Sequence, residues 1–97
     1  MIETLIASSP DGTAANFYRT AAGAEIDLLL TAPGEKPWAI EIKRSLTSKL
    51  EKGFYLACED LQPQKRVAVY PGQEAFPLPN GVTVMSLSAA GRLLLDR

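Results

Sequence analysis

Two neighbouring stretches of the chain, residues 25–30 and 38–43, alternate between side chains that favour a core and side chains that favour solvent. A repeat of two residues is typical of a strand that buries one face, so the pattern predicts two strands. Pro33-Gly34 lies between them and indicates a turn. The sequence therefore predicts an antiparallel hairpin centred on Gly34.

A hairpin centred on Gly34 sets residues at equal sequence distances from it opposite each other. We expect Asp27 opposite Glu41, and Glu25 opposite Lys43. These four charged residues then share one face, because a slip of one residue would turn the apolar set outward. The opposite face carries Ile26, Leu28, Trp38, Ile40 and Ile42. A shift of two residues would keep the face and change the partners.

The expected pairing of Asp27 with Glu41 needs an explanation, since like charges directly opposite each other destabilise a sheet. A bound cation explains it, and so does a raised pKa on one carboxyl. Ligands that are all oxygen suit magnesium, manganese or calcium rather than zinc. The alternative is a solvated sheet face with a Glu25–Lys43 pair, and the pattern alone leaves both open.

The remaining pattern predicts further elements on both sides of the hairpin. They are a helix over residues 1–7, a strand over 15–20, a helix over 48–61, strands over 66–70 and 82–85, and a helix over 88–95. The third of these begins with a Ser48-x-x-Glu51 capping box and carries a buried stripe that includes Cys58. Gly53 within it suggests a close approach of helix and sheet. A strand, a helix and a strand in succession predict a right-handed crossover with parallel strands, and hence an α/β domain.

The composition of the chain excludes several classes of catalytic and metal site. The 97 residues suffice for one domain, residues 1–97, and contain no histidine. Histidine acid–base catalysis, imidazole-dependent triads and histidine-containing zinc sites are therefore excluded. The 10 basic and 11 acidic residues give a net charge of −1, which matches a dedicated DNA-binding domain poorly. Chemistry in this chain must come from carboxylates, lysine and a metal.

The chain has no apolar run long enough for a membrane span, and Glu3 lies where a signal peptide would carry basic residues. Its single cysteine, Cys58, cannot form an internal disulfide. We therefore expect a cytoplasmic protein without membrane contact.

The hairpin resembles a known enzyme motif. Asp27, followed fourteen positions later by Glu41-Ile42-Lys43, resembles the PD-(D/E)XK nuclease motif. The longer segments Phe17–Asp27 and Ala39–Ser45 resemble the nuclease-like domain of unknown function at the C-terminus of many prokaryotic AAA-type ATPases. The similarity runs from about Phe17 to the end of the chain. It implies a restriction-endonuclease-like core, with an antiparallel β-meander and a β-α-β crossover in one mixed sheet flanked by helices.

The resemblance also implies roles for the hairpin residues. Asp27 and Glu41 would hold Mg²⁺ or Mn²⁺, with the backbone carbonyl of Ile42 as a third ligand. Lys43 would orient or deprotonate the attacking water, or stabilise charge on the phosphate. Glu25 would be a further ligand or a partner that positions Lys43.

Two residues outside the hairpin are candidates for the same site. In the nuclease fold a longer N-terminal helix usually adds an acidic residue; only Glu3 is available here, and a solvated first-turn acid is the favoured interpretation. For Arg19 a structural ion pair near the acidic cluster is favoured over a catalytic role.

Two functions follow from the resemblance. The first is metal-dependent phosphodiester hydrolysis by a nuclease that acts on nucleic acid. The alternative is a catalytically inactive nuclease-fold module for protein interaction or regulation, attached to an AAA-type ATPase or forming a homodimer. Adjacent Leu93, Leu94 and Leu95 wrap more than one helix face and favour a contact with a second subunit. The resemblance also implies that the chain lacks part of the N-terminal helix or an upstream ATPase domain.

Overall fold

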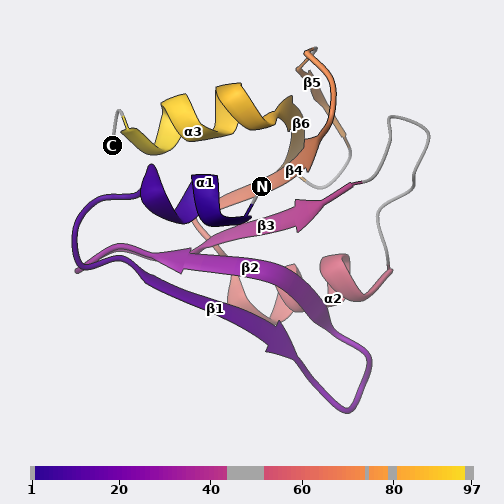
Figure 1. The fold of residues 1–97 in the computed structure, drawn as a ribbon. Coiled ribbons are helices and arrows are strands. Elements are labelled where there is room, and N and C mark those ends of the chain that lie inside the picture. The colour runs from indigo at the N-terminus through magenta and orange to yellow at the C-terminus, as the bar shows by residue number, and fades with distance from the viewer. Residues whose placement is uncertain (1, 44–51, 74, 79–80, 96–97) are drawn as a thin grey trace.

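A single mixed sheet with the strand order β1-β2-β3-β4-β6-β5 runs through the molecule (Figure 1). The structure is a computed structural model that describes residues 2–43, 52–73, 75–78 and 81–95. The strands are β1 (Ala14–Arg19), β2 (Glu25–Thr31), β3 (Trp38–Ile42), β4 (Lys65–Tyr70), β5 (Phe76–Pro77) and β6 (Val82–Ser86). The helices are α1 (Ile2–Ala7), α2 (Lys52–Leu61) and α3 (Leu87–Leu95).

The strand directions follow the predicted scheme. Strands β1, β2 and β3 form an antiparallel meander, and β3, β4 and β6 are parallel. Helix α2 lies between β3 and β4 in the chain, as a parallel connection requires. The prediction of a mixed α/β sheet flanked by helices is confirmed. The short strand β5 was not predicted.

Helices cover both faces of the sheet, so the core has two halves (Figure 1). The α2-side core contains Ala24, Ile26, Leu29, Ala39, Phe54, Ala57, Cys58, Ala68, Tyr70, Val82 and Val84. The α1/α3-side core contains Leu5, Leu28, Leu30, Trp38, Ile40, Val67, Val69, Met85, Ala90 and Leu94. Successive residues of β4 alternate between the two cores, so this strand is covered on both faces. Burial also raises the pKa of the Cys58 thiol, in keeping with the predicted packing role.

The hairpin between β2 and β3 is centred on Gly34, as predicted. Gly34 has a φ of 76°, and the Glu35 N–H donates to the Ala32 carbonyl at 3.1 Å. Proline at the second position and a glycine with positive φ at the third are the signature of a type II turn. The resulting partners, Leu28 with Ile40, Leu29 with Ala39 and Leu30 with Trp38, confirm the predicted register.

A β-bulge in β2 contradicts the predicted alternation of faces. Asn16 of β1 pairs with Leu29, but Tyr18 pairs with Ile26, so Asp27 and Leu28 together lie opposite the single residue between them. Two residues against one define a bulge, which interrupts the alternation of faces along the strand. Ile26 therefore belongs to the α2-side core and not, as we expected, to the face of Leu28.

The N-terminal turn of α2 lies directly against β2, as Gly53 suggested. A Cβ atom at Gly53 would overlap the Gly23 carbonyl oxygen and lie 3.3 Å from the Glu25 nitrogen. These are backbone atoms, which cannot move aside cheaply, so only glycine fits. The capping box predicted for residues 48–51 lies outside the described residues.

We expect Gly53→Ala to lower the free energy of unfolding by about 1–3 kcal/mol, although alanine favours helix by up to about 1 kcal/mol. Gly91→Ala in α3 is the matched control, because its Cβ would meet only the Ser8 side-chain oxygen at 3.3 Å. Urea denaturation of both variants measures the difference. Equal stability of the two variants would contradict the close contact.

Candidate functional site

The candidate site lies where β2 and β3 stop pairing. Their ladder extends from Leu30–Trp38 to Leu28–Ile40. One step further, the Ile42 N–H donates to the Asp27 carboxylate at 3.0 Å instead of to a backbone carbonyl. The next residue, Lys43, donates its N–H to the Val69 carbonyl of β4 at 2.7 Å. Strand β3 thus stays with β4, and the Asp27 side chain fills the gap beside β2.

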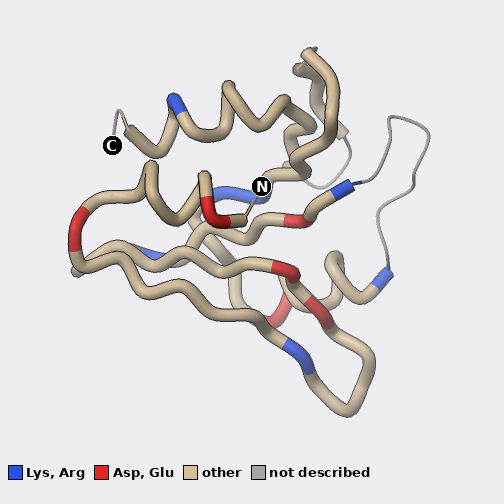
Figure 2. The backbone as a smooth tube through the Cα atoms, viewed as in Figure 1, with Lys and Arg blue, Asp and Glu red and all other residues tan. Residues whose placement is uncertain are grey.

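Asp27 and Glu41 meet in this gap. The Asp27 and Glu41 side chains lie close enough for a hydrogen bond between them when Glu41 is protonated. Glu41 is only 8% exposed, and its Oε1 atom is buried with no hydrogen-bond partner. Figure 2 shows acidic residues on the neighbouring strands β2 and β3, in red. The structure therefore brings together the carboxylate pair that the sequence pattern singled out.

The environment of Glu41 favours its protonated form and raises its pKa from 4.5 to about 8. The largest cause is burial, which removes water from around the charge. The hydrogen bond with the Asp27 side chain and the negative charges of Asp27 and Glu25 act in the same direction, while a hydrogen bond with the Asp27 backbone opposes them. This is the raised pKa that two facing carboxylates predict.

The expected Glu25–Lys43 pair does not form. Glu25 instead forms an ion pair of 3.0 Å with Arg19, its register partner on β1. Both side chains are largely exposed, so the pair adds little stability. A structural role for Arg19 agrees with the sequence-based expectation.

Lys43 is 7% exposed and directly follows β3. Among the described residues, no carboxylate lies within ion-pair distance of its ammonium group. It is also absent from the lining of the cavity that the acidic pair shares. In the described structure Asp27, Glu41 and Ile42 therefore line one cavity, and Lys43 does not line it.

A cavity of about 370 Å³ opens onto the acidic pair on the side of α2. It is lined by Gly23, Glu25, Asp27, Glu41, Ile42 and Gly53. The two glycines form its wall, which explains why the tight contact of α2 with β2 matters to the site.

Asp27 also lines a second cavity, of about 430 Å³, together with Ile2, Glu3 and Ile42. Asp27 is thus reachable from both sides of the strand gap. Glu3 is exposed, in agreement with the solvated first-turn acid that the sequence favoured, and it lines this cavity together with Asp27.

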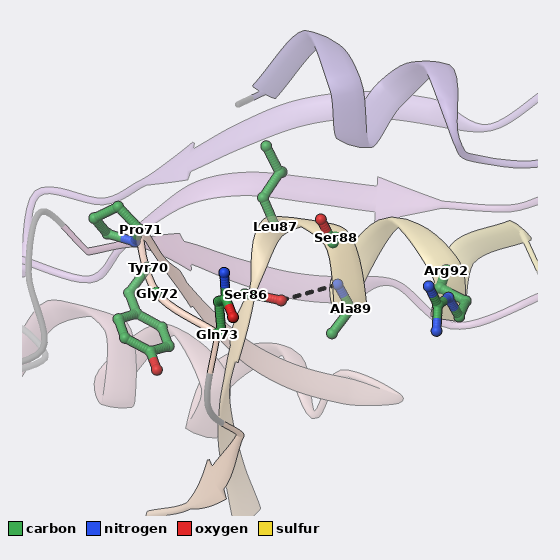
Figure 3. A pocket seen from close by; sticks show the side chains of 9 residues that line it. All are labelled: Tyr70, Pro71, Gly72, Gln73, Ser86, Leu87, Ser88, Ala89 and Arg92. Atoms are coloured by element: carbon green, nitrogen blue, oxygen red, sulfur yellow. Dashed lines mark hydrogen bonds between the residues drawn. The ribbon is translucent and has the colours of Figure 1, made fainter.

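A larger cavity, of about 590 Å³, lies at the carboxyl ends of β4 and β6 and does not include the acidic pair (Figure 3). Its wall contains the start of α3, where the Ser86 hydroxyl accepts a hydrogen bond from the Ala89 N–H at 3.1 Å. Among the residues that the structure describes, no acidic side chain lines it. Size alone therefore does not identify the site that has the clearest chemistry.

The acidic pair can offer oxygen ligands to a cation. Within the described ranges, no group of three or more Asp, Glu, Cys or His side chains lies close enough to hold a metal ion. The available donors are the two carboxylates and nearby backbone carbonyls. Magnesium uses sets of this kind, since it keeps several waters and takes one or two carboxylates plus substrate phosphates.

Fold and site together define a small α/β domain with a buried carboxylate pair at a strand gap. Residues 1–90 match a family described as a domain of unknown function, DUF4143, and the chain belongs to that family. It is 36% identical over 69 residues to the uncharacterized proteins Rv2008c of Mycobacterium tuberculosis and Mb2031c of Mycobacterium bovis. The match covers 71% of this chain and 15% of each relative. The chain thus spans about 15% of the length of the curated relatives it matches.

No solved structure matches this chain. In the part of the chain that the structure describes, no helix is long and apolar enough to cross a membrane.

We expect the free energy of unfolding to fall as the pH rises from 4.5 to about 8, because folded Glu41 holds its proton more tightly than the unfolded chain does. One proton contributes a slope of at most about 1.4 kcal/mol per pH unit. Glu41→Gln keeps the hydrogen-bonding shape without the charge. It should flatten this slope and stabilise the protein above neutral pH.

Denaturation at a series of pH values measures the slope. Glu59→Gln, at an exposed position of α2, is the control and should leave it unchanged. A slope that survives in Glu41→Gln would contradict the assignment.

Proposed function

We propose that this chain is a metal-dependent phosphodiester hydrolase of the PD-(D/E)XK nuclease class, acting on nucleic acid with Mg²⁺ or Mn²⁺. The observation that carries the proposal is the pairing of Asp27 with the buried Glu41 at the gap between β2 and β3. A solvated sheet face, the alternative interpretation of the sequence, does not account for a carboxylate that is 8% exposed.

The unpartnered oxygen of Glu41 supports a cation ligand. A buried acceptor without a partner costs free energy, and a second carboxylate beside it adds repulsion. A divalent cation would offset both costs by replacing the proton that the pair otherwise retains. Oxygen-only donors fit magnesium or manganese, in agreement with the ion that the resemblance implies.

Ile42 supports the same assignment through its backbone. In a strand, the N–H and C=O of one residue point toward the same neighbouring strand. Because the Ile42 N–H donates to Asp27, its carbonyl is also directed toward β2. This orientation suits the proposed role of the Ile42 carbonyl as a third ligand.

The order of elements is consistent with the nuclease fold that the resemblance implies. A helix precedes the meander β1–β3, and α2 connects β3 to the parallel strand β4. Asp27 and Glu41 occur on the second and third strands, and Lys43 follows the third. The agreement supports a restriction-endonuclease-like core.

The residues would divide the reaction between them. A bound cation would activate water and neutralise charge on the phosphate. Asp27 and Glu41 would hold the cation, while the Ile42 N–H keeps the Asp27 carboxylate oriented. Lys43 would move toward the phosphate or the attacking water, since it has no carboxylate partner among the described residues. Glu25, paired with Arg19, would tune the charge of the site rather than bind the metal.

The alternative is an inactive nuclease-fold module attached to an AAA-type ATPase. Two observations favour it. The net charge of −1 offers little attraction for nucleic acid. Lys43 does not line the cavity of the acidic pair. In this alternative the carboxylate pair would bind a cation for stability or regulation.

We expect calorimetric titration to detect Mg²⁺ or Mn²⁺ binding to the wild type and not to Asp27→Asn. Binding should release a proton from Glu41, so the measured heat should change with the ionisation enthalpy of the buffer. Glu25→Gln is the matched control and should retain most of the binding. No binding to the wild type, or equal binding to Asp27→Asn, would reject the metal site.

We expect Lys43→Ala to lower cleavage of DNA or RNA by about 10²–10⁴-fold, the usual contribution of a group that assists proton transfer. Metal binding by this variant should be unchanged, because Lys43 is not a ligand. Lys52→Ala, an exposed lysine at the start of α2, is the control. Metal binding without cleavage by the wild type would favour the inactive module.

A further inference from the structure

The strand at one edge of the sheet, β1, is covered by no other element in the part of the chain that the structure describes. Its six residues are exposed except for the half-buried Tyr18. Phe17 at its centre is 71% exposed, the largest exposed fraction among the large apolar side chains described. An apolar, uncovered edge strand is a template for pairing with another strand.

Strand β1 lacks most of the features that usually prevent such pairing, and its one charged residue, Arg19, is paired with Glu25. Edge strands are commonly short, or carry proline, lysine or a bulge. The opposite edge of this sheet follows that rule, because β5 has two residues and one of them is Pro77. The sequence of β1, AANFYR, contains neither proline nor lysine, and the bulge beside it lies in β2. The two edges are therefore built differently.

The free hydrogen-bonding groups of β1 can be assigned by alternation. The Thr20 N–H donates to the Ala24 carbonyl, so Thr20 is directed toward β2. Because successive residues of a strand alternate, Tyr18 and Asn16 share that direction. The N–H and C=O groups of Ala15, Phe17 and Arg19 then point away from the sheet.

These outward groups suit a second copy of the same strand. If a two-fold axis passes through Phe17, each Phe17 exchanges two hydrogen bonds with its mate, and each Ala15 does so with the other copy's Arg19. The two phenyl rings meet on one face, as favourable aromatic cross-strand pairs do. No like charges come opposite each other, and each Arg19 already has Glu25 as a partner. The low net charge of −1 opposes association little.

We propose that two copies of this chain pair along β1, antiparallel about a two-fold axis through Phe17, to form one continuous sheet. This inference does not depend on the proposed hydrolase activity.

The same axis would align the two acidic sites. Phe17 is the residue opposite Asp27 and Leu28 in the bulge, so both sites lie level with the axis. They would be separated by about four strand spacings of ~4.8 Å, roughly 19 Å, on the same face of the joined sheet. A symmetric ligand could then reach both.

Sedimentation equilibrium tests the assembly. The wild type should have twice the mass of one chain, and Phe17→Lys should be a monomer because two lysines would meet on the axis. Leu95→Lys is the matched control, since Leu95 is 70% exposed on α3. It should remain a dimer. A monomeric wild type, or a dimer that Leu95→Lys dissociates and Phe17→Lys does not, would overturn the proposal.

Cysteine cross-linking tests the register. In the proposed pairing the Cα atoms of the two residues at position 17 lie about 5.5 Å apart, within the range of a disulfide. Phe17→Cys should therefore give a covalent dimer on oxidation. Ala15→Cys should not, because its mate would be roughly 14 Å away along the strand. The native Cys58 is buried and does not compete. Cross-linking at position 15, or at neither position, would overturn the axis through Phe17.

Discussion

The hydrogen bond from the Ile42 N–H to the Asp27 carboxylate is the contact on which the candidate site depends. It replaces a backbone ladder bond at the point where β2 and β3 separate. The separation follows from the bulge, which inserts one extra residue into β2 and directs Asp27 toward the gap. A regular hairpin would pair backbone groups here, and the carboxylate would have no backbone N–H to accept from. The extra residue in β2 therefore creates the gap at which the candidate site forms.

Burying a carboxylate beside another is unfavourable, and the rest of the fold makes it tolerable. Glu41 lies between β2 and the parallel strand β4, with its backbone secured in the ladder opposite Ala68. Apolar packing on both faces of the sheet keeps that strand in place. The cost of this burial is visible in two features of Glu41, its raised pKa and its buried oxygen without a hydrogen-bond partner. Perturbed pKa values of this kind are common at binding sites, because the ligand can remove the unfavourable interaction.

The glycines near the site matter because they have no side chain and allow close contact, and not because they make the backbone flexible. Gly53 lets α2 approach the Gly23 carbonyl, and both residues line the cavity in front of Glu41. A larger residue in α2 would push the helix outward and reduce the burial that raises the Glu41 pKa. The chemistry of the site and the packing of α2 are thus coupled, while the exposed β1 edge lies on the other side of Asp27.

Local sequence pattern determined the helices and strands other than β5, the Gly34 turn, the β2–β3 register and the pairing of Asp27 with Glu41. Each of these depends on neighbours in the chain: period-two alternation, turn chemistry and equal distances from one glycine. The pattern failed at Ile26, because a bulge depends on how β1 packs against β2 and has no marker in the residues themselves. The pattern failed likewise for Glu25, which forms an ion pair with Arg19, its register partner on β1, and not with Lys43. The burial of Glu41 was a tertiary outcome too, since it required α2 to close over the sheet.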